Sequence, residues 1–307
     1  MRAISEGRFR ADDIGMNGHR RKLLAALSCL CLTLVLPVAA GAAEIVDRNV
    51  GAPTLQVDSH NVALVSYTVK GAQRHVLYWG AVDWADAFKR DYSGGWKSKV
   101  ADYKRFSNSC GHYTGQLLPY MIAACDAPDG SHWALQQWGR LWSNYGGNRA
   151  ANELYIAHWR GQPAKLAIQT DYSYHGKHEH LWGLFMFHGK PVYGLHSTLQ
   201  GVPLDKQGRN IYVDYLAGSD WRRVNSFLTH SPTAGFCYTF ADHPASDPAW
   251  NGRGTGPAYR ATAIGPGVSP VVQQHFAPPG PYDEATDSGA NQAQQEVLKG
   301  DRRCRVD

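Results

Sequence analysis

The sequence lacks the short motifs that mark the commonest catalytic and nucleotide-binding sites. It contains no HExxH zinc motif, no Cys-x-x-Cys pair, no glycine-rich phosphate loop and no G-x-S-x-G nucleophile elbow. A catalytic site can still be assembled from distant loops, so these absences do not exclude an enzyme. They leave the catalytic residues unassigned and indicate no cofactor.

Acidic side chains suited to carboxylate catalysis are also few. After residue 43 there are five glutamates, and only Glu153 and Glu179 lie inside the predicted folded domain. A glycosidase needs two carboxyl groups several ångströms apart in a cleft. The aspartates that could partner these glutamates are Asp171, Asp214 and Asp220, and no spacing selects a pair. An extracellular hydrolase acting on cell-wall or other polysaccharide is therefore the alternative function, not the preferred one.

No run of like charges occurs after residue 43, and the charge balance there is close to neutral. Residues 1–43 hold six of the 31 Arg and Lys and three of the 26 Asp and Glu, which leaves a net charge of +2. Nucleic-acid binding requires a concentrated basic face. The charge balance therefore does not indicate a nucleic-acid partner, and none is expected.

The first 43 residues have the pattern of a secretory signal peptide. A basic stretch at 19–22 precedes an apolar run at 23–40, and small residues follow it at 40–43. Cleavage near Ala42 and Ala43 is expected. The rival interpretation is a membrane anchor, because the run approaches the ~20 residues that cross a bilayer. Pro37 and the alanine-rich exit favour cleavage. We therefore expect a secreted protein with no stable membrane span.

Four cysteines remain after the leader, namely Cys110, Cys125, Cys237 and Cys304. In an exported protein the default state of cysteine is a disulfide. Cys110 with Cys125 closes a short loop, which restricts the unfolded chain by roughly 3 kcal/mol. Cys237 with Cys304 then follows by exclusion. The same context makes a structural Cys110 more plausible than a thiol nucleophile beside His112.

Helical periodicity and repeats of constant length are almost absent, whereas short β-branched and aromatic runs are frequent. Turn signals separate them every 8 to 12 residues, a pattern typical of an antiparallel β-sandwich or barrel-like domain built from hairpins. The predicted hairpins span 61–82, 110–138, 153–174 and 181–198, and further strands are expected in 202–215, 235–240 and 258–264. The segment 221–228 fits either a strand or a short helix. The predicted domain is 44–268. Residues 269–307, rich in Pro, Gly and Gln, are predicted to form a flexible tail.

Four segments carry a resemblance to a known family. They are RHVLYWGAV, CDAPDGSHWALQQW, LQGVPLDKQGRNIYVDYL and WRRVNSFLTHSPTAGFCYTF. With these segments the chain resembles, over roughly residues 60–268, a family of secreted actinobacterial proteins of uncharacterised function. The resemblance implies an exported single domain and no particular reaction.

Ligand-type side chains are most concentrated at His175, His178 and His180, which form a candidate metal site. His196 could join them only if the turn at His188-Gly189 had three residues. X-Gly turns favour two residues, which pairs Phe187 with Lys190. That register gathers Trp182, Leu184, Met186, Tyr193 and Leu195 on one apolar face. A solvated histidine-rich loop is the competing interpretation.

Aromatic side chains suggest a binding surface. Trp133 and Trp138 are an odd number of positions apart, so they point to opposite faces of their strand. At least one is then expected on an outer face, where tryptophan stacks on sugars or anchors partner proteins. The candidate ligand-binding residues are Trp133, Trp138, Trp182 and Tyr193. The preferred function is a non-catalytic binding or structural protein of the cell envelope or exterior, engaging glycan or another protein. Packing in the core is the competing role for these residues, and the sequence indicates no oligomeric state.

Overall fold

The structure, a computed structural model, describes residues 44–80, 97–100, 106–141, 151–173, 176–192, 209–229, 235–242, 256–264, 269–288, 294 and 296–298. These residues form antiparallel sheets with little helix, which confirms the predicted all-β class. No helix among them is long and apolar enough to cross a bilayer. The predicted signal peptide at 1–43 lies outside the described residues.

The first sheet contains the disulfide-stapled hairpin. Its strand order is β1 (Glu44–Arg48), β9 (Ala151–Trp159), β8 (His132–Arg140), β7 (Met121–Asp126) and β6 (Gly111–His112). β7 and β8 pair directly around the turn at 127–131. A disulfide joins Cys110 and Cys125, whose Cα atoms are 5.6 Å apart. The predicted hairpin and its covalent staple are both confirmed.

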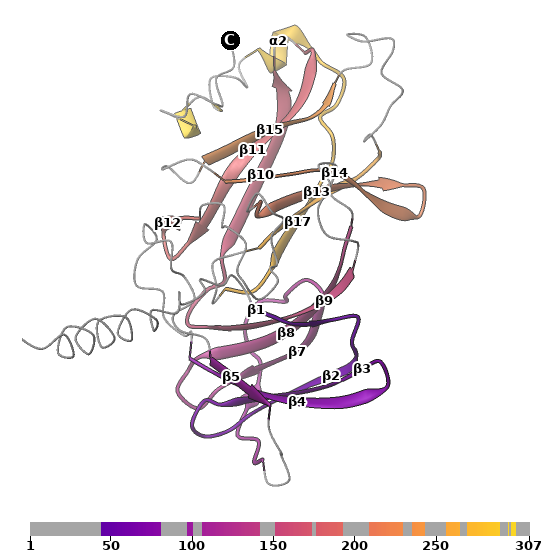
Figure 1. Cartoon of the computed structure of the whole chain (residues 1–307). Helices are drawn as coiled ribbons and strands as arrows, with labels where there is room; N and C mark the ends of the chain where they lie inside the picture. The colour runs from indigo at the N-terminus through magenta and orange to yellow at the C-terminus, as the bar shows by residue number, and fades with distance from the viewer. Residues whose placement is uncertain are drawn as a thin grey trace, which may run out of the picture. The chain divides into compact units, whose positions relative to one another are not determined.

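The second sheet covers one face of the first. It contains β2 (Gly51–Val57), β3 (Ala63–Val69), β4 (Ala72–Trp79) and β5 (Lys97–Val100) (Figure 1). Lys70 and Gly71 connect β3 to β4 and both have positive φ, 49° and 79°. Positive φ at both connecting residues is the backbone conformation of the type I′ turn, which two-residue hairpin loops favour. Alternate residues of the two sheets meet in one buried cluster that includes Val57, Ala63, Val65, Trp133, Leu135, Leu154 and Ile156.

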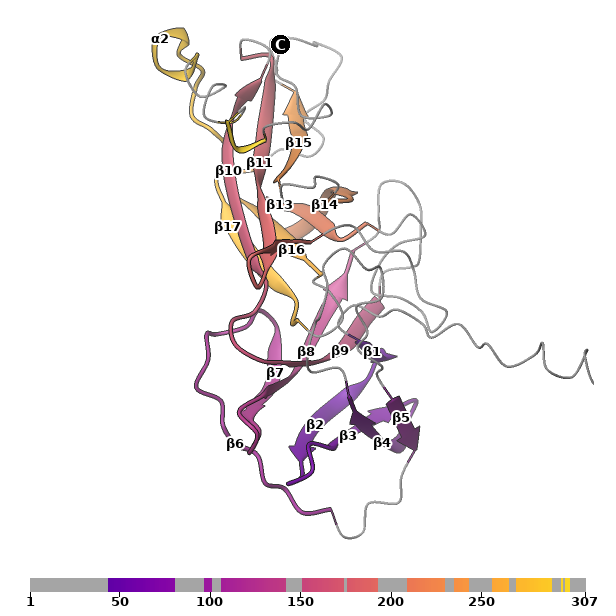
Figure 2. The ribbon, with the colours of Figure 1, turned by 90° about the vertical axis from the view of Figure 1, so that its left-hand side faces the viewer.

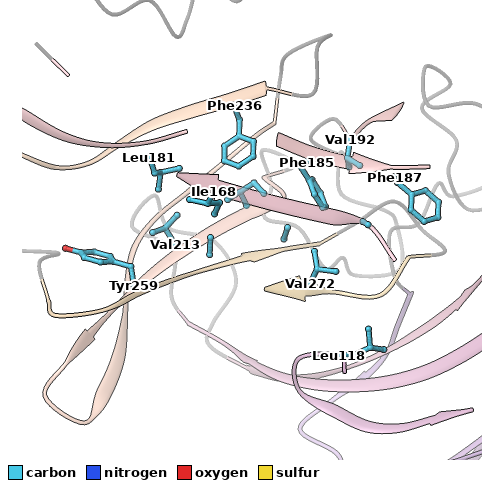
Figure 3. Packing of buried hydrophobic residues seen from close by; sticks show 14 of the residues in the cluster. Leu118, Ile168, Leu181, Phe185, Phe187, Val192, Val213, Phe236, Tyr259 and Val272 are labelled. Atoms are coloured by element: carbon cyan, nitrogen blue, oxygen red, sulfur yellow. The ribbon is translucent and has the colours of Figure 1, made fainter. Parts of the chain in front are cut away.

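Two more sheets enclose a second core. One is formed by β10 (Lys165–Ser173), β11 (His178–Phe187), β12 (Lys190–Pro191) and β15 (Gly235–Asp242), with β11 paired to the other three. The other has the order β14 (Asp220–Phe227), β13 (Ile211–Ala217), β16 (Tyr259–Ala263), β17 (Val272–Phe276). Figure 3 shows the apolar side chains between them, among them Leu181, Phe185, Val213, Phe236 and Val272. Ala134, Ala157 and Trp159, from β8 and β9, belong to the same cluster.

The hairpin predicted over 153–174 does not form. β9 pairs with β1 and β8, whereas β10 pairs with β11, so the chain leaves one sheet and enters another between Trp159 and Lys165. β9 is buried from Glu153 to Trp159. A strand buried on both faces lacks the alternation of apolar and polar residues that marks a half-exposed strand. Its sequence therefore does not specify which neighbour it pairs with.

The tail predicted from residue 269 begins with an ordered strand. β17 pairs with β16, and Val272 is 6% exposed. A short helix, α2 (Glu284–Asp287), follows, with Asp283 capping its N-terminus. The prediction of a flexible tail is therefore wrong for these segments. The Pro- and Gly-rich composition of the whole tail concealed a five-residue strand that pairs with β16 along its full length.

Candidate functional site

Trp133 and Trp138 point to opposite faces of β8, as predicted, but neither is exposed. Trp133 is 0% and Trp138 1% exposed. Trp133 lies in the cluster shared with the second sheet and stacks on His158. Trp138 packs with Tyr155 and Tyr212 in a separate cluster. Because both faces of β8 are covered, the prediction that one tryptophan lies on an outer or cleft surface is wrong.

Trp182 is also buried, at 4% exposure, and Tyr193 lies outside the described residues. The two-residue turn at His188-Gly189 is confirmed by the pairing of Phe187 with Lys190. The core side of β11 is nevertheless the one with Leu181, Phe185 and Phe187. The apolar face predicted for Trp182, Leu184 and Met186 is therefore not the main core face. Trp182 instead packs beneath the C-terminal residues Val297 and Leu298.

The predicted histidine site is only partly described. His178 pairs with Ser173 and His180 with Asp171 across β10 and β11, while His175 and His196 lie outside the described residues. His180 is 5% exposed, and its Nδ1 is 3.7 Å from Asp171 Oδ1. Within the described residues no three His, Cys, Asp or Glu side chains are gathered to hold a metal. Metal binding by His175, His178 and His180 stays a prediction.

The two candidate glutamates lie in different sheets and different environments. Glu153 is fully buried, forms an ion pair with Arg48 at 3.0 Å, and accepts a hydrogen bond from the Tyr155 hydroxyl. The buried Oε2 of Glu179, by contrast, accepts no hydrogen bond within the described residues. Burial raises the pKa of Glu179. The ion pair with Arg48 makes Glu153 a structural carboxylate.

Only one cysteine of the predicted second disulfide lies among the described residues. Cys237 is disulfide-bonded, and Cys304 lies outside the described residues. Their pairing therefore stays a prediction. Since Cys110 is bonded to Cys125, Cys110 has no free thiol to act as a nucleophile.

The turn between β7 and β8 carries an acidic side chain with strong local support. Asp129 accepts hydrogen bonds from the backbone N–H and the hydroxyl of Ser131. It also forms an ion pair with Arg160, whose Nη2 lies 2.8 Å from Asp129 Oδ2. Burial alone would raise the pKa of Asp129. The bonds from Ser131 and Arg160 outweigh it and lower that pKa to about 2.

We expect Asp129→Asn to lower the free energy of unfolding by about 1 kcal/mol at neutral pH, after allowance for solvent screening. A carboxylate whose pKa is depressed in the folded state stabilises above its unfolded pKa, near ~3.9, and loses that contribution as pH falls through the folded value. The difference between wild type and variant should therefore disappear between about pH 4 and pH 2. Urea titrations across this range measure it, with the exposed Asp220→Asn as the matched control. A difference that persisted at the acidic end would contradict the ionic origin.

The structure also reveals a surface that the sequence interpretation missed, the open edge of β7. β8 pairs with β7 on one side. On the other side β6 pairs only at Gly111 with Asp126 and at His112 with Cys125 (Figure 2). No other described strand pairs along 121–124. An unpaired strand edge presents backbone N–H and C=O groups to solvent.

This open edge is lined by exposed apolar side chains. Leu117 is 84% exposed, Met121 37% and Ile122 44%, which places three of the five large exposed hydrophobic side chains of the described residues within six positions. The register shift between Met121 and Ala123 accounts for two consecutive exposed residues on one strand. A sequence signal existed, because the run 121–124 is apolar without alternation. We call Leu117, Met121, Ile122 and the open edge of 121–124 the β7 edge surface.

Comparisons of the chain with protein-family models, with curated proteins and with solved structures found no match. The assignment of a function therefore depends on the chemistry of the described residues.

Proposed function

We propose that the chain is an exported β-rich binding protein that captures another extracellular protein by adding an extended segment of it to the β7 edge surface. The observation that carries this proposal is the open edge at 121–124 beside the exposed Leu117, Met121 and Ile122. In strand addition, main-chain hydrogen bonds supply affinity, and side chains of the receptor select the ligand residues. Both elements are present on this surface.

The chemistry of the β7 edge surface favours a peptide over a glycan. Unpaired backbone amides and carbonyls are complementary to another backbone, and apolar side chains beside them accept apolar residues of the ligand. Glycan recognition on a β-sheet would need exposed aromatic rings. The tryptophans predicted for that purpose, Trp133, Trp138 and Trp182, are buried. The ligand that fits this surface is therefore a protein segment and not a glycan.

Other outer strands of the described sheets carry features that oppose strand addition. β5 contains Lys97 and Lys99, β2 contains Pro53, and β14 contains Arg222 at an exposed position. Charged residues and proline on edge strands prevent unwanted pairing. The stretch 121–124 contains neither a charge nor a proline, so its open edge lacks the features that protect β5, β2 and β14.

Export is part of the proposal and has two supports. The N-terminal pattern of residues 1–43 is that of a signal peptide. The disulfide between Cys110 and Cys125 is a bond that persists in oxidising compartments. This disulfide also joins residue 110, which precedes β6, to residue 125 of β7 and so holds one end of the β7 edge in place. A pre-ordered edge loses less conformational entropy when a ligand strand is added.

Ile122→Lys is expected to weaken peptide binding at least about tenfold, because a charge on an edge strand opposes pairing and removes apolar contact. The ligands for this test are extended peptides selected from a random display library against the wild-type protein. Calorimetry then compares their dissociation constants for wild type and variant. The matched control is Val100→Lys, because Val100 is 78% exposed on the outer strand β5.

The control variant should bind the selected peptides as the wild type does. Failure to select any peptide, or equal affinity of wild type and Ile122→Lys, would overturn the proposed function.

An extracellular hydrolase remains the alternative, and the raised pKa of Glu179 is the observation in its favour. The charge of Glu179 contributes to the raised pKa of Tyr172 and Tyr259, after the larger effect of burial. Two tyrosines thus lie in its electrostatic neighbourhood. Glycosidase chemistry also requires a second carboxylate at a defined separation across a cleft. The raised pKa of Glu179 is therefore the single observation that favours this alternative.

A further inference from the structure

Two arginines and one aspartate form a buried row across the sheet that contains β14, β13 and β16 (Figure 2). Asp214 pairs with Arg223 on one neighbouring strand and with Arg260 on the other. Its carboxylate oxygens accept from Nε of Arg223 and, at 3.0 Å, from Nε of Arg260. We call Asp214, Arg223 and Arg260 the arginine cluster. One carboxylate is thus shared between two guanidinium groups.

The Arg223 guanidinium has donors that this arrangement does not use. Its Nε donates to Asp214, whereas Nη1 and Nη2 are buried and have no hydrogen-bond partner within the described residues. The side chain is only 3% exposed, so bulk water does not take the place of a partner. Buried polar groups are almost always hydrogen-bonded, and an unsatisfied charged donor is costly. The far end of Arg223 therefore lacks the acceptor that a buried guanidinium needs.

The surrounding charges favour an acceptor that is negative. Among the described residues, Asp214 is the only carboxylate that forms an ion pair with either arginine. Asp220 and Arg222, the charged neighbours on β14, are exposed. His275, which pairs with Arg260 on β17, brings no negative charge. Two cations that share one anion attract a further negative charge.

Aromatic rings surround the arginine cluster. The Arg223 guanidinium lies over Tyr212, 4.7 Å from the ring centroid. Trp138 packs against the same Tyr212 with ring centroids 5.6 Å apart, and its indole N–H also has no acceptor within the described residues. Unsatisfied donors of two residues thus adjoin one tyrosine ring, in surroundings of low polarity where a charge-assisted hydrogen bond is strong.

The arginine cluster meets solvent on the side of Arg260. The Arg260 side chain is 11% exposed, compared with 3% for Arg223. Its guanidinium lies over the half-buried Trp221, 4.4 Å from the ring centroid. Trp221 stands next to the turn of the β13–β14 hairpin, where it pairs with Leu216. A ligand from solvent therefore meets Arg260 and Trp221 first, and only a small one fits between them and Arg223.

The geometry of the free donors selects a carboxylate. Nη1 and Nη2 of one guanidinium form a planar fork that matches the two oxygens of a carboxylate. A carboxylate bound to this fork lies in the guanidinium plane and so extends over the Tyr212 ring together with it. A tetrahedral phosphate would instead place oxygens out of that plane.

We propose that the arginine cluster is a binding site for one small carboxylate, which accepts from Nη1 and Nη2 of Arg223 and is attracted by Arg260. Short aliphatic carboxylates such as acetate are the class of ligand that fits. Asp214 positions both guanidinium groups and does not itself bind the ligand. This site lies on a different sheet from the β7 edge surface, and it can be correct whether or not that surface binds peptides.

The test is a nuclear magnetic resonance titration of the intact, oxidised protein with sodium acetate, in which sodium chloride keeps the ionic strength constant. The side-chain N–H signals of Arg223 and Arg260 are expected to shift and saturate, with a dissociation constant on the order of 1 mM for so small a ligand. Acetamide, which has the same shape and no charge, should cause no saturable shift. Inorganic phosphate should bind at least about tenfold more weakly than acetate.

Arg223→Lys keeps the charge beside Asp214 and loses the fork, so the dissociation constant for acetate should rise at least about tenfold. Arg222→Lys, at the exposed neighbouring position, is the matched control and should bind acetate as the wild type does. Backbone amide spectra show whether Arg223→Lys is folded. If it is not, the comparison of acetate, acetamide and phosphate on the wild type decides.

Four results would overturn the proposal. They are the absence of a saturable shift with acetate, an equal response to acetamide, phosphate that binds as tightly as acetate, and a folded Arg223→Lys variant with an unchanged dissociation constant.

Discussion

Asp214→Asn is expected to lower the free energy of unfolding by about 3 to 5 kcal/mol, the cost of leaving buried charges without their counter-ion. Asp214 is fully buried on β13 and accepts from Nε of Arg223 and, at 3.0 Å, from Nε of Arg260. The Arg223 side chain is 3% exposed, and its two terminal nitrogens have no other hydrogen-bond partner within the described residues. Asp214 thus neutralises two guanidinium groups from neighbouring strands.

Denaturant unfolding of the variant measures this loss. Arg222→Met, at an exposed position of β14, is the control and should change stability by less than about 0.5 kcal/mol. The triple variant Asp214→Leu, Arg223→Met, Arg260→Met should recover most of the loss, because apolar side chains can replace a buried ion network. A loss below about 1 kcal/mol for Asp214→Asn would contradict the electrostatic role.

Trp133→Ala is expected to cost a similar amount, about 3 to 5 kcal/mol, because it opens a large cavity between the first and second sheets. Trp133 is 0% exposed, and its ring stacks on His158 with centroids 3.7 Å apart. Trp133→Phe keeps a ring in the cluster and should cost less, about 1 to 3 kcal/mol.

The same variant distinguishes the core role of Trp133 from the ligand-binding role that the sequence suggested. If Trp133 is a core residue, Trp133→Ala lowers the free energy of unfolding, and the molecules that remain folded bind the selected peptides with unchanged affinity. Trp133→Ala with nearly unchanged stability and abolished ligand binding would restore the sequence hypothesis and contradict the structure.

Features that depend on neighbouring residues were predictable from the sequence. The short loop between Cys110 and Cys125 predicts their disulfide, and it forms. The dipeptide His188-Gly189 predicts a two-residue turn, and both residues have the positive φ that such a turn needs, 48° and 73°. Alternation and turn signals likewise predicted the all-β class.

Features that depend on distant pairing were not predictable. Period-two alternation placed Trp133 and Trp138 on opposite faces correctly, but it could not show that β8 is covered on both faces. Gly161 suggested a hairpin between β9 and β10, whereas each strand pairs with others. The order of strands in a sheet decides such outcomes, and that order is not contained in a local pattern.

The β7 edge surface was missed for the same reason. The run 121–124 reads as an ordinary buried strand until the partner on each side is known. β6 is only two residues long, and this fact leaves the edge open. Conversely, the composition of residues 269–307 was interpreted as a whole, which concealed both β17 and the packing of Leu298 on Trp182.

Amide hydrogen exchange along β7, with and without a selected peptide, tests the proposed binding mode most directly. Strand addition predicts that backbone amides of residues 121–124 on the edge away from β8 gain protection when the peptide is bound, while those of β5 and β14 do not. Binding that leaves the exchange of 121–124 unchanged, or that protects a different strand, would contradict the assignment of β7 as the recognition edge.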